Sequence, residues 1–210
     1  MSVANDLETK KLVKENKIII DPYFEDFQGP NCYYCHLGNR YYKSKKSNEI
    51  IDISKTCDTN QYFELFENQN EIILKPGEFI LTETFEYLGA DNSHIIRLHN
   101  TTTLARWGIY HAGLGFVNAG CGDKNPIKLT LELVNLSKND LRLKCTNIRN
   151  GIIDYGTEVL KICVVSLSAE AGMGYRGMYN GDKSVTLPKI KKYENEYRID
   201  NNSLHNRRRS

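Results

Sequence analysis

Apolar and polar positions alternate over short stretches of the chain, and Gly or Pro separates many of these stretches from the next. The stretches are rich in Ile, Tyr, Phe and Thr, residue types that favour β-strands. We expect strands at Lys17–Asp21, Tyr33–Tyr42, Glu71–Leu74, Glu78–Tyr87, Ile95–Leu98, Lys128–Asn135 and Glu158–Ser166. Many short strands at this spacing predict a mostly β domain, built as a barrel or a jelly roll.

Two short helices interrupt the strand pattern. Asn5, followed three residues later by Glu8, is typical of a helix N-terminus, because an asparagine oxygen can accept a bond from a free backbone N–H. The second helix is expected near Thr102–Trp107. Residues 43–60 are polar and charged without a clear period, which predicts an excursion on the surface.

The strand at Lys128–Asn135 shows the clearest period of two. Its leucines at 129, 131 and 133 are expected on one face, and Thr130 and Glu132 on the other. A lone acid among apolar neighbours can have a raised pKa, which suits proton transfer near neutral pH. The alternative interpretation of Glu132 is an ordinary exposed strand acid.

Residues 168–184 combine flexibility with groups that can recognise a ligand. Glycine recurs here, and tyrosine and arginine stand between the glycines. The residues are Gly172, Gly174, Tyr175, Arg176, Gly177, Tyr179 and Gly181. The pattern alone fits a mobile lid and an irregular surface loop equally well.

Composition narrows the class of protein. At 210 residues the chain is expected to form one domain, residues 1–190, followed by a charged flexible tail, residues 191–210. The net charge of +2 does not favour a nucleic-acid partner. Arg207–Arg209 fit a solvated tail better than a targeting or polyanion-binding patch, because three charges are few.

The expected location is the cytoplasm or another intracellular compartment. No apolar signal region and no stretch of about 18 apolar residues is visible, so no membrane partner is expected and the protein is expected to be soluble. The six cysteines are therefore interpreted as reduced thiols. Cys32 and Cys35 form a lone Cys-x-x-Cys pair, which predicts core or edge thiols rather than a metal site.

Four segments, taken in order, resemble the trimeric dCTP deaminase family, a branch of the dUTPase superfamily. They are Ile18–Asn39, Leu74–Tyr87, the hydroxyl-rich turn Thr102–Gly108 that carries one arginine, and the strand Leu129–Asn135. The resemblance covers residues 5–190. It implies a dUTPase-like distorted jelly roll, a homotrimer with sites between subunits, and a lid, residues 168–190, that closes over the nucleotide.

The resemblance implies hydrolytic deamination of dCTP to dUTP and ammonia. Glu132 matches the glutamate that shuttles protons, Arg106 the arginine that positions it and the water, and Thr102 a serine whose hydroxyl holds the water. The signatures of zinc-dependent deaminases, His-x-Glu and Pro-Cys-x-x-Cys, are absent from the chain. We therefore expect no catalytic zinc, and Mg²⁺ only as carried by the triphosphate.

The resemblance also marks residues that would bind the substrate, a deoxycytidine nucleotide. They are Thr103, His111, Asn118, Gly120, Arg176, Tyr179, Asp182 and Lys183. Asn118 stands where the family usually has an aspartate; its amide can bond a sugar hydroxyl but cannot act as a base, which argues against dUTPase chemistry. For His111, a packed structural histidine is an equally good interpretation.

Three further departures keep rival functions open. Thr101 and Met178 replace an arginine and a lysine of the family pattern, and Asp182 replaces a base-contacting glutamine. Arg176 and Lys183 are the expected substitutes for the missing phosphate contacts. The rivals are a catalytically silent nucleotide-binding or regulatory trimer, and a purely structural trimer.

Overall fold

The computed structural model of the protein describes residues 2–54 and 58–189, and within them one large antiparallel sheet dominates. Its path runs β8-β10-β6-β3-β14-β7-β9, with β1 beside β14, β2 beside β6 and β4 beside β3. The members are β1 (Ser2–Val3), β2 (Ile18–Asp21), β3 (Tyr33–Ser44), β4 (Phe63–Phe66), β6 (Phe79–Ala90), β7 (His94–His99), β8 (Ile109–His111), β9 (Phe116–Val117), β10 (Ile127–Asn135) and β14 (Glu158–Ser166). The mostly β prediction is confirmed.

Two small two-stranded sheets and two helices accompany this sheet in the described structure. β5 (Glu71–Leu74) pairs with β11 (Leu141–Lys144), and β12 (Asn147–Arg149) pairs with β13 (Ile152–Asp154). The helices are α1 (Asp6–Lys14) and α2 (Thr102–Arg106), and 3₁₀ turns occur at Glu25–Phe27 and Thr59–Tyr62. None of the helices in residues 2–54 and 58–189 has the length and apolarity that crossing a bilayer requires.

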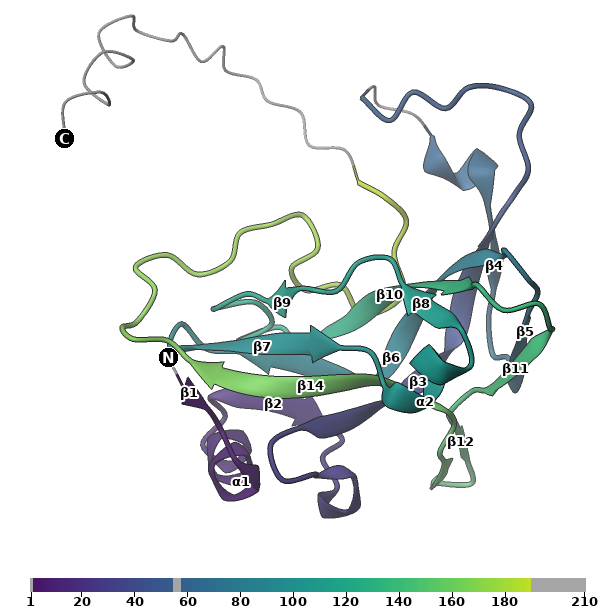
Figure 1. Ribbon diagram of the computed structural model, residues 1–210. Coiled ribbons are helices and arrows are strands. Elements are labelled where there is room, and N and C mark those ends of the chain that lie inside the picture. Colours follow the sequence, from purple (N-terminus) through teal and green to yellow (C-terminus); the bar gives the residue numbers. More distant parts are fainter. Residues whose placement is uncertain (1, 55–57, 190–210) are drawn as a thin grey trace, which may run out of the picture.

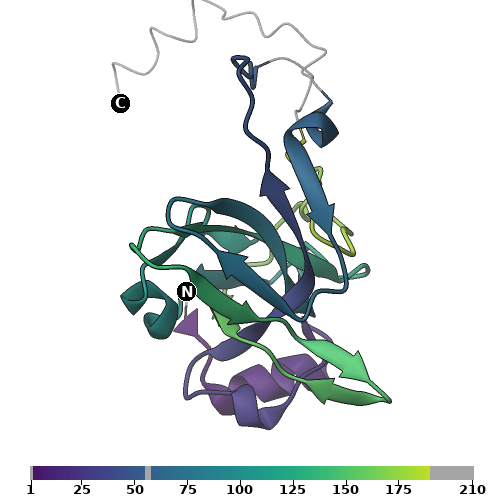
Figure 2. The same ribbon diagram turned by 90° about the vertical axis from the view of Figure 1, so that its right-hand side faces the viewer.

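The sheet curls, and its two sides carry different elements (Figure 1). Helix α1 lies below β2, whereas residues 167–189, here called the C-terminal segment, run along the other side above β9 and β10. Residues 45–54 and 58–62 extend beyond the ends of β3 and β4 as an arm that leaves the body (Figure 2). The surface excursion predicted for residues 43–60 is therefore confirmed for its described part.

The local predictions agree closely with the elements. All seven expected strands are present, and the side chain of Asn5 accepts a bond of 2.9 Å from the backbone N–H of Glu8 at the start of α1. Thr101 caps α2 by accepting from the N–H of Leu104 at 3.3 Å. The predicted tail, residues 191–210 with Arg207–Arg209, lies outside the described residues.

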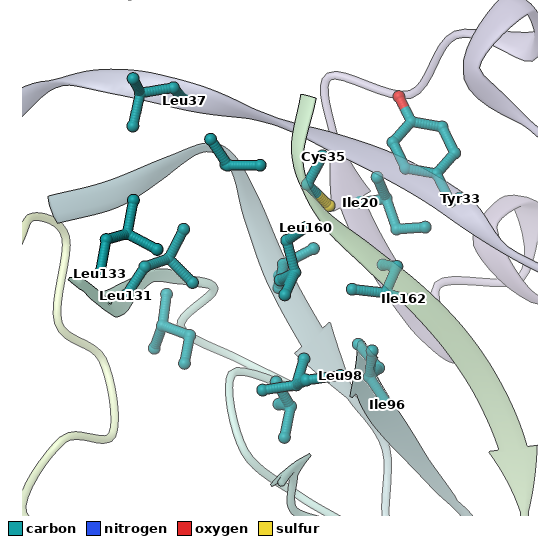
Figure 3. Packing of buried hydrophobic residues seen from close by; sticks show 14 of the residues in the cluster. Ile20, Tyr33, Cys35, Leu37, Ile96, Leu98, Leu131, Leu133, Leu160 and Ile162 are labelled. Atoms are coloured by element: carbon teal, nitrogen blue, oxygen red, sulfur yellow. The ribbon is translucent and has the colours of Figure 1, made fainter. Parts of the chain in front are cut away.

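The apolar core fills the inside of the curled sheet. Leu131 and Leu133 on β10 pack there together with residues of β2, β3, β7 and β14 (Figure 3). Cys35 is fully buried in this core and Cys32 is nearly so, which confirms the prediction of core thiols. Burial raises the pKa of the Cys35 thiol well above its usual value.

The three leucines of β10 lie against the core as the alternation predicts, but they are not equally buried. Leu131 and Leu133 are buried in the core, whereas Leu129 is half-buried and packs against its edge. The register between β10 and β6 shifts between Lys128 and Thr130, as at a β-bulge, next to Leu129. Leu129 also borders the cavity that Thr130 and Glu132 line.

Candidate functional site

A cavity of about 440 Å³ opens between strands β6 and β10, the β9 loop and the C-terminal segment. Its size is in the range of small-molecule binding sites. Strand β10 contributes Lys128, Leu129, Thr130 and Glu132, and β6 contributes Phe79 and Leu81. The strands form one wall because Glu132 lies directly opposite Leu81 in the antiparallel pairing, and Val134 lies opposite Phe79.

Glu132 is the acid of this wall. Its backbone oxygen accepts the N–H of Ala112 at 2.8 Å, which fixes the strand edge beside it. The carboxyl is half-buried, and desolvation raises its pKa above the usual value for glutamate. Gly113, just after β8, leaves room for the carboxyl of Glu132, since a Cβ added to Gly113 would lie 2.9 Å from Glu132 Oε2. The site therefore holds a carboxyl that can take up a proton more readily than an exposed one.

The loop after β9 forms a second wall. Asn118 lines the cavity, and its backbone oxygen accepts the N–H of Cys121 at 3.0 Å in a tight turn. Gly120 does not line the cavity. Its φ of +75° and its contacts explain the glycine, because an added Cβ would lie 2.7 Å from the Cα of Gly174. Gly120 thus lets the C-terminal segment approach the loop.

The C-terminal segment closes the cavity from the remaining side. Tyr175, Tyr179, Asp182 and residues 186–188 line it, and the N–H of Tyr175 donates to Ala119 O at 2.9 Å. Asp182 is ion-paired with Lys189 at 2.9 Å. The part of the chain predicted to be a lid therefore forms part of the site, as the lid interpretation requires.

Several candidate residues lie away from this cavity. Thr102, Thr103 and Arg106 project from α2 and are exposed, and none of them lines the cavity. Arg176 is exposed on the C-terminal segment. Lys183 is also exposed, and its ammonium donates to Pro126 O at 2.6 Å.

His111 lies in the protein interior. Its Nε2 donates to Val159 O at 2.9 Å, and the residue is only 2% exposed. Desolvation lowers its pKa to about 4, so the ring is neutral near neutral pH. His111 therefore contacts the backbone of β14 rather than the cavity.

Sequence reasoning missed part of the cavity wall. Lys128, Phe79 and Leu187 line it, and none was a candidate. For Lys128 a signal existed, since it stands two and four residues before Thr130 and Glu132 on one strand. Phe79 and Leu187 carry no local signal, because only the pairing of β6 with β10 and the path of the C-terminal segment bring them there.

The residues in and around the cavity do not form a metal-binding cluster. Across residues 2–54 and 58–189, no group of three or more His, Cys, Asp or Glu side chains could hold a metal ion.

Comparison with known proteins gives a consistent family. Residues 3–147 match the family model described as dCTP deaminase-like. The protein named "dCTP deaminase, dUMP-forming" of Methanopyrus kandleri is 29% identical over 201 residues, covering 90% of this chain and 96% of that protein. The "dCTP deaminase" of Pyrobaculum calidifontis is 28% identical over 195 residues, covering 90% and 97%.

A solved structure shows the same fold. The 2′-deoxycytidine 5′-triphosphate deaminase from Agrobacterium tumefaciens superposes with a TM-score of 0.56 at 13% identity, over 77% of this chain. The chain spans about half, 47%, of the length of that chain. The fold expected from the resemblance is therefore confirmed.

Proposed function

Because the chain belongs to the dCTP deaminase-like family, we propose that it is an enzyme that hydrolyses the exocyclic amino group of dCTP and releases ammonia. The observation that carries this proposal is Glu132, a half-buried carboxyl with a raised pKa on the wall of a nucleotide-sized cavity. The other acid that lines the cavity, Asp182, is paired with Lys189. The relatives' names supply the substrate class, and Glu132 supplies the group that the reaction needs.

The chemistry requires a proton carrier close to C4 of cytosine. In the proposed mechanism Glu132 accepts a proton from water as the oxygen bonds to C4, and passes it to N3 of the ring. A second proton from the water oxygen then goes to the amino nitrogen. The C4–N bond breaks, ammonia leaves, and the C4 carbonyl of uracil forms. A carboxyl with a raised pKa suits both directions of transfer.

The remaining catalytic groups are proposed to come from a neighbouring subunit of a homotrimer. Thr102 and Arg106 are exposed on α2 and do not reach the described cavity of their own subunit. Apolar side chains stand exposed beside them, at Trp107, Tyr110 and Leu136. An exposed apolar patch next to exposed functional side chains fits a subunit interface. There Arg106 would position Glu132 and the water, Thr102 would hold the water, and Thr103 would contact the substrate.

We propose dUTP as the product, with Asn118 as the supporting observation. Asn118 lines the cavity, where its amide can bond the 3′-hydroxyl of deoxyribose but cannot take a proton from water. Relatives named as dUMP-forming and relatives named only as deaminases both match at 24–29% identity. Identity at this level does not choose between the products.

The triphosphate is proposed to enter with Mg²⁺ as part of the substrate. Tyr179 and Asp182 line the cavity, and Arg176 and Lys183 are the two cations of the same segment besides Lys189, which is paired with Asp182. If Arg176→Ala and Lys183→Ala each leave nucleotide affinity unchanged, these two residues have no role in phosphate binding. Gly120 contributes by letting the segment approach, and His111 by supporting β8 from inside.

The experiment that tests the function incubates purified protein with dCTP and Mg²⁺, measures ammonia, and separates dUTP from dUMP. Ammonia with dUTP supports both the reaction and the product. Ammonia with dUMP contradicts the role given to Asn118. Absence of ammonia from dCTP, dCMP and CTP would contradict the enzymatic function and favour the silent binding trimer.

A thermal shift separates the two non-enzymatic rivals. A ligand that binds only the folded state raises the unfolding temperature by mass action. Stabilisation by dCTP or dUTP with Mg²⁺ would exclude the purely structural trimer, because that protein has no nucleotide site.

A further inference from the structure

Glu83 on β6 is a buried carboxylate that the proposed chemistry does not use. The residue is 1% exposed, and a charge so deeply buried needs partners. It has two. Lys128 Nζ lies 3.3 Å from Oε1, and the backbone N–H of Val185 donates to Oε2 at 2.6 Å. The first partner lies on β10, and the second lies on the C-terminal segment.

These contacts place Glu83 under the part of the C-terminal segment that closes the cavity, residues 182–188, here called the strap. Two further bonds hold the strap to β10. The N–H of Lys128 donates to Asp182 O at 2.9 Å, and the N–H of Thr186 donates to Thr130 Oγ1 at 3.1 Å. Val185, between these bonds, is buried, so while the strap is docked its N–H relies on Glu83 rather than on water.

Lys128 is itself held in place. Its ammonium lies 5.5 Å from the ring centre of Phe85 and 5.4 Å from that of Tyr87, within the range of cation–π attraction. On the other side of Glu83, Gly38 leaves the space that the carboxylate stem occupies, since an added Cβ would lie 2.6 Å from Glu83 Cγ. The carboxylate therefore has one position, and that position faces the strap.

We propose that Glu83 is a positioning residue that fixes the strap against the cavity in the geometry that binds nucleotide. The proposal rests on the proposed function, because it takes the cavity as the nucleotide site. Asp182, Thr186 and Leu187 line that site only while the strap is docked. Loss of the Glu83 carboxylate frees the strap and weakens nucleotide binding, while Glu132 and its strand remain in place.

The test compares Glu83→Ala with Glu86→Ala, a matched control. Glu86 is a buried carboxylate on the same strand, but its oxygens bond His36, at 2.7 Å to Nδ1 and 2.8 Å to the backbone N. Hydrogen exchange of residues 182–189 and the kinetic constants for dCTP with Mg²⁺ are measured for both. For Glu83→Ala we expect faster exchange in the strap and a KM about tenfold higher, with kcat changed by less than about threefold.

Two more variants keep the test decisive. Glu83→Gln retains an acceptor for the Val185 N–H and is expected to keep strap exchange and KM close to those of the unchanged protein. Val185→Pro removes the donor from the strap without touching β6, so it reports on the same bond if Glu83→Ala does not fold. It is expected to raise KM as Glu83→Ala does.

The outcomes separate this proposal from the proposed function. Equal strap exchange in Glu83→Ala and Glu86→Ala, or an unchanged KM in Glu83→Ala and Val185→Pro, would overturn the role of Glu83 while leaving the deaminase intact. If the unchanged protein neither binds nor deaminates dCTP, the proposed function is refuted. If hydrogen exchange in the strap is still faster in Glu83→Ala than in the unchanged protein, the contact between Glu83 and the strap stands without that function.

Discussion

At the scale of single residues, Glu132 shows how burial sets both reactivity and stability. Desolvation raises the pKa of its carboxyl in the folded protein. The folded protein therefore binds this proton more tightly than the unfolded chain. At pH values above the raised pKa, the buried Glu132 carboxylate is charged and lowers the free energy of unfolding. This destabilisation disappears as the pH falls below the usual pKa of glutamate, because the carboxyl is then protonated in both the folded and the unfolded chain.

Glu132→Gln is expected to abolish deamination and to stabilise the protein at the same time. Ammonia release should fall at least about 100-fold, because the amide cannot carry the proton. The unfolding temperature should rise at about pH 8 and should approach that of the unchanged protein at about pH 4, where the native carboxyl is protonated. Glu64→Gln, at an exposed acid of β4, is the control and should change neither quantity. Retained activity in Glu132→Gln would contradict the mechanism.

At the scale of elements, helix α1 depends on a cap that the sequence alone indicates. The Asn5 side chain satisfies the N–H of Glu8, one of the free donors of the first turn, and Asp6 and Glu8 favour the same end of the helix. Thr9 and Leu12 bury one side of α1. The helix is short, so a single cap is a large part of its local stability.

Asn5→Ala is expected to lower the free energy of unfolding by about 1 kcal/mol, because the N–H of Glu8 loses its acceptor. Asn5→Asp keeps an acceptor oxygen and should stay within about 0.5 kcal/mol of the unchanged protein. Urea unfolding measures both. A cap role for Asn5 is contradicted if the alanine and aspartate variants unfold at the same urea concentration.

The approach of β6 to the loop after β9 sets a second element-scale prediction. A Cβ added to Gly89 would lie 2.4 Å from Gly122 O, which is a backbone atom and cannot rotate away. Gly89→Ala should therefore lower the free energy of unfolding by about 1–3 kcal/mol. Gly115→Ala is the control, since nothing lies within 4 Å of its added Cβ. Thermal unfolding compares the two variants. Equal unfolding temperatures would show that β6 and the loop after β9 can move apart at little cost in free energy.

At the scale of the whole molecule, the described structure separates the two side chains that are proposed to act together in the reaction. Glu132 lines the cavity, whereas Arg106 lies on exposed α2, next to Trp107 at 62% exposure and close in sequence to Tyr110 at 54%. Closed symmetric assemblies bring such separated surfaces together at every interface. The homotrimer remains a proposal, and it makes a quantitative prediction about mixed assemblies.

Glu132→Gln and Arg106→Ala are each expected to be inactive alone and partly active when unfolded, mixed and refolded together. A site between subunits is complete when Glu132 comes from one variant and Arg106 from the other. In a random equal mixture this holds for roughly a quarter of the sites. Light scattering gives the mass of the assembly, and ammonia release gives the activity. If the mixture is no more active than the separate variants, the site is not shared as proposed. Either one subunit supplies both residues, or Arg106 is not part of the site.

A variant at the exposed patch supplies the control for that experiment. Leu136→Asp, at a side chain 67% exposed beside α2, should break the proposed trimer and lower activity together. Ile148→Asp, at 62% exposure on β12, should leave both unchanged. If the trimer is lost in Ile148→Asp but kept in Leu136→Asp, the interface lies near β12 rather than beside α2.

Local features of this protein were readable from its sequence. The cap at Asn5, the helix at Thr102–Arg106 and the seven predicted strands follow from hydrogen-bonding side chains and from a period of two, which act between near neighbours. The short strands β1, β4, β8, β9 and β11 to β13 were not predicted. All except the local pair of β12 and β13 exist through pairing with strands farther away along the chain. Their two to four residues carry too little pattern of their own.

The candidate site divides in the same way. Glu132 and Thr130 could be assigned to one face from alternation alone, and Asn118, Tyr179 and Asp182 were suggested by resemblance; all of them line the cavity. That the half-buried Leu129 also borders the cavity could not be predicted, since the register of β10 against β6 shifts beside it. The interior position of His111 depended on Val159 of β14, 48 residues away.

The sequence by itself determined the elements and the chemistry available to them, because propensity, capping and alternation depend on residues close along the chain. Only the tertiary structure decided which of those groups meet. Glu83 received Lys128 and the N–H of Val185, 45 and 102 residues away, because β10 pairs with β6 and the strap crosses both. The partners of a buried charge are set by which residues the fold brings near it, and residues so far apart in the sequence form no periodic pattern.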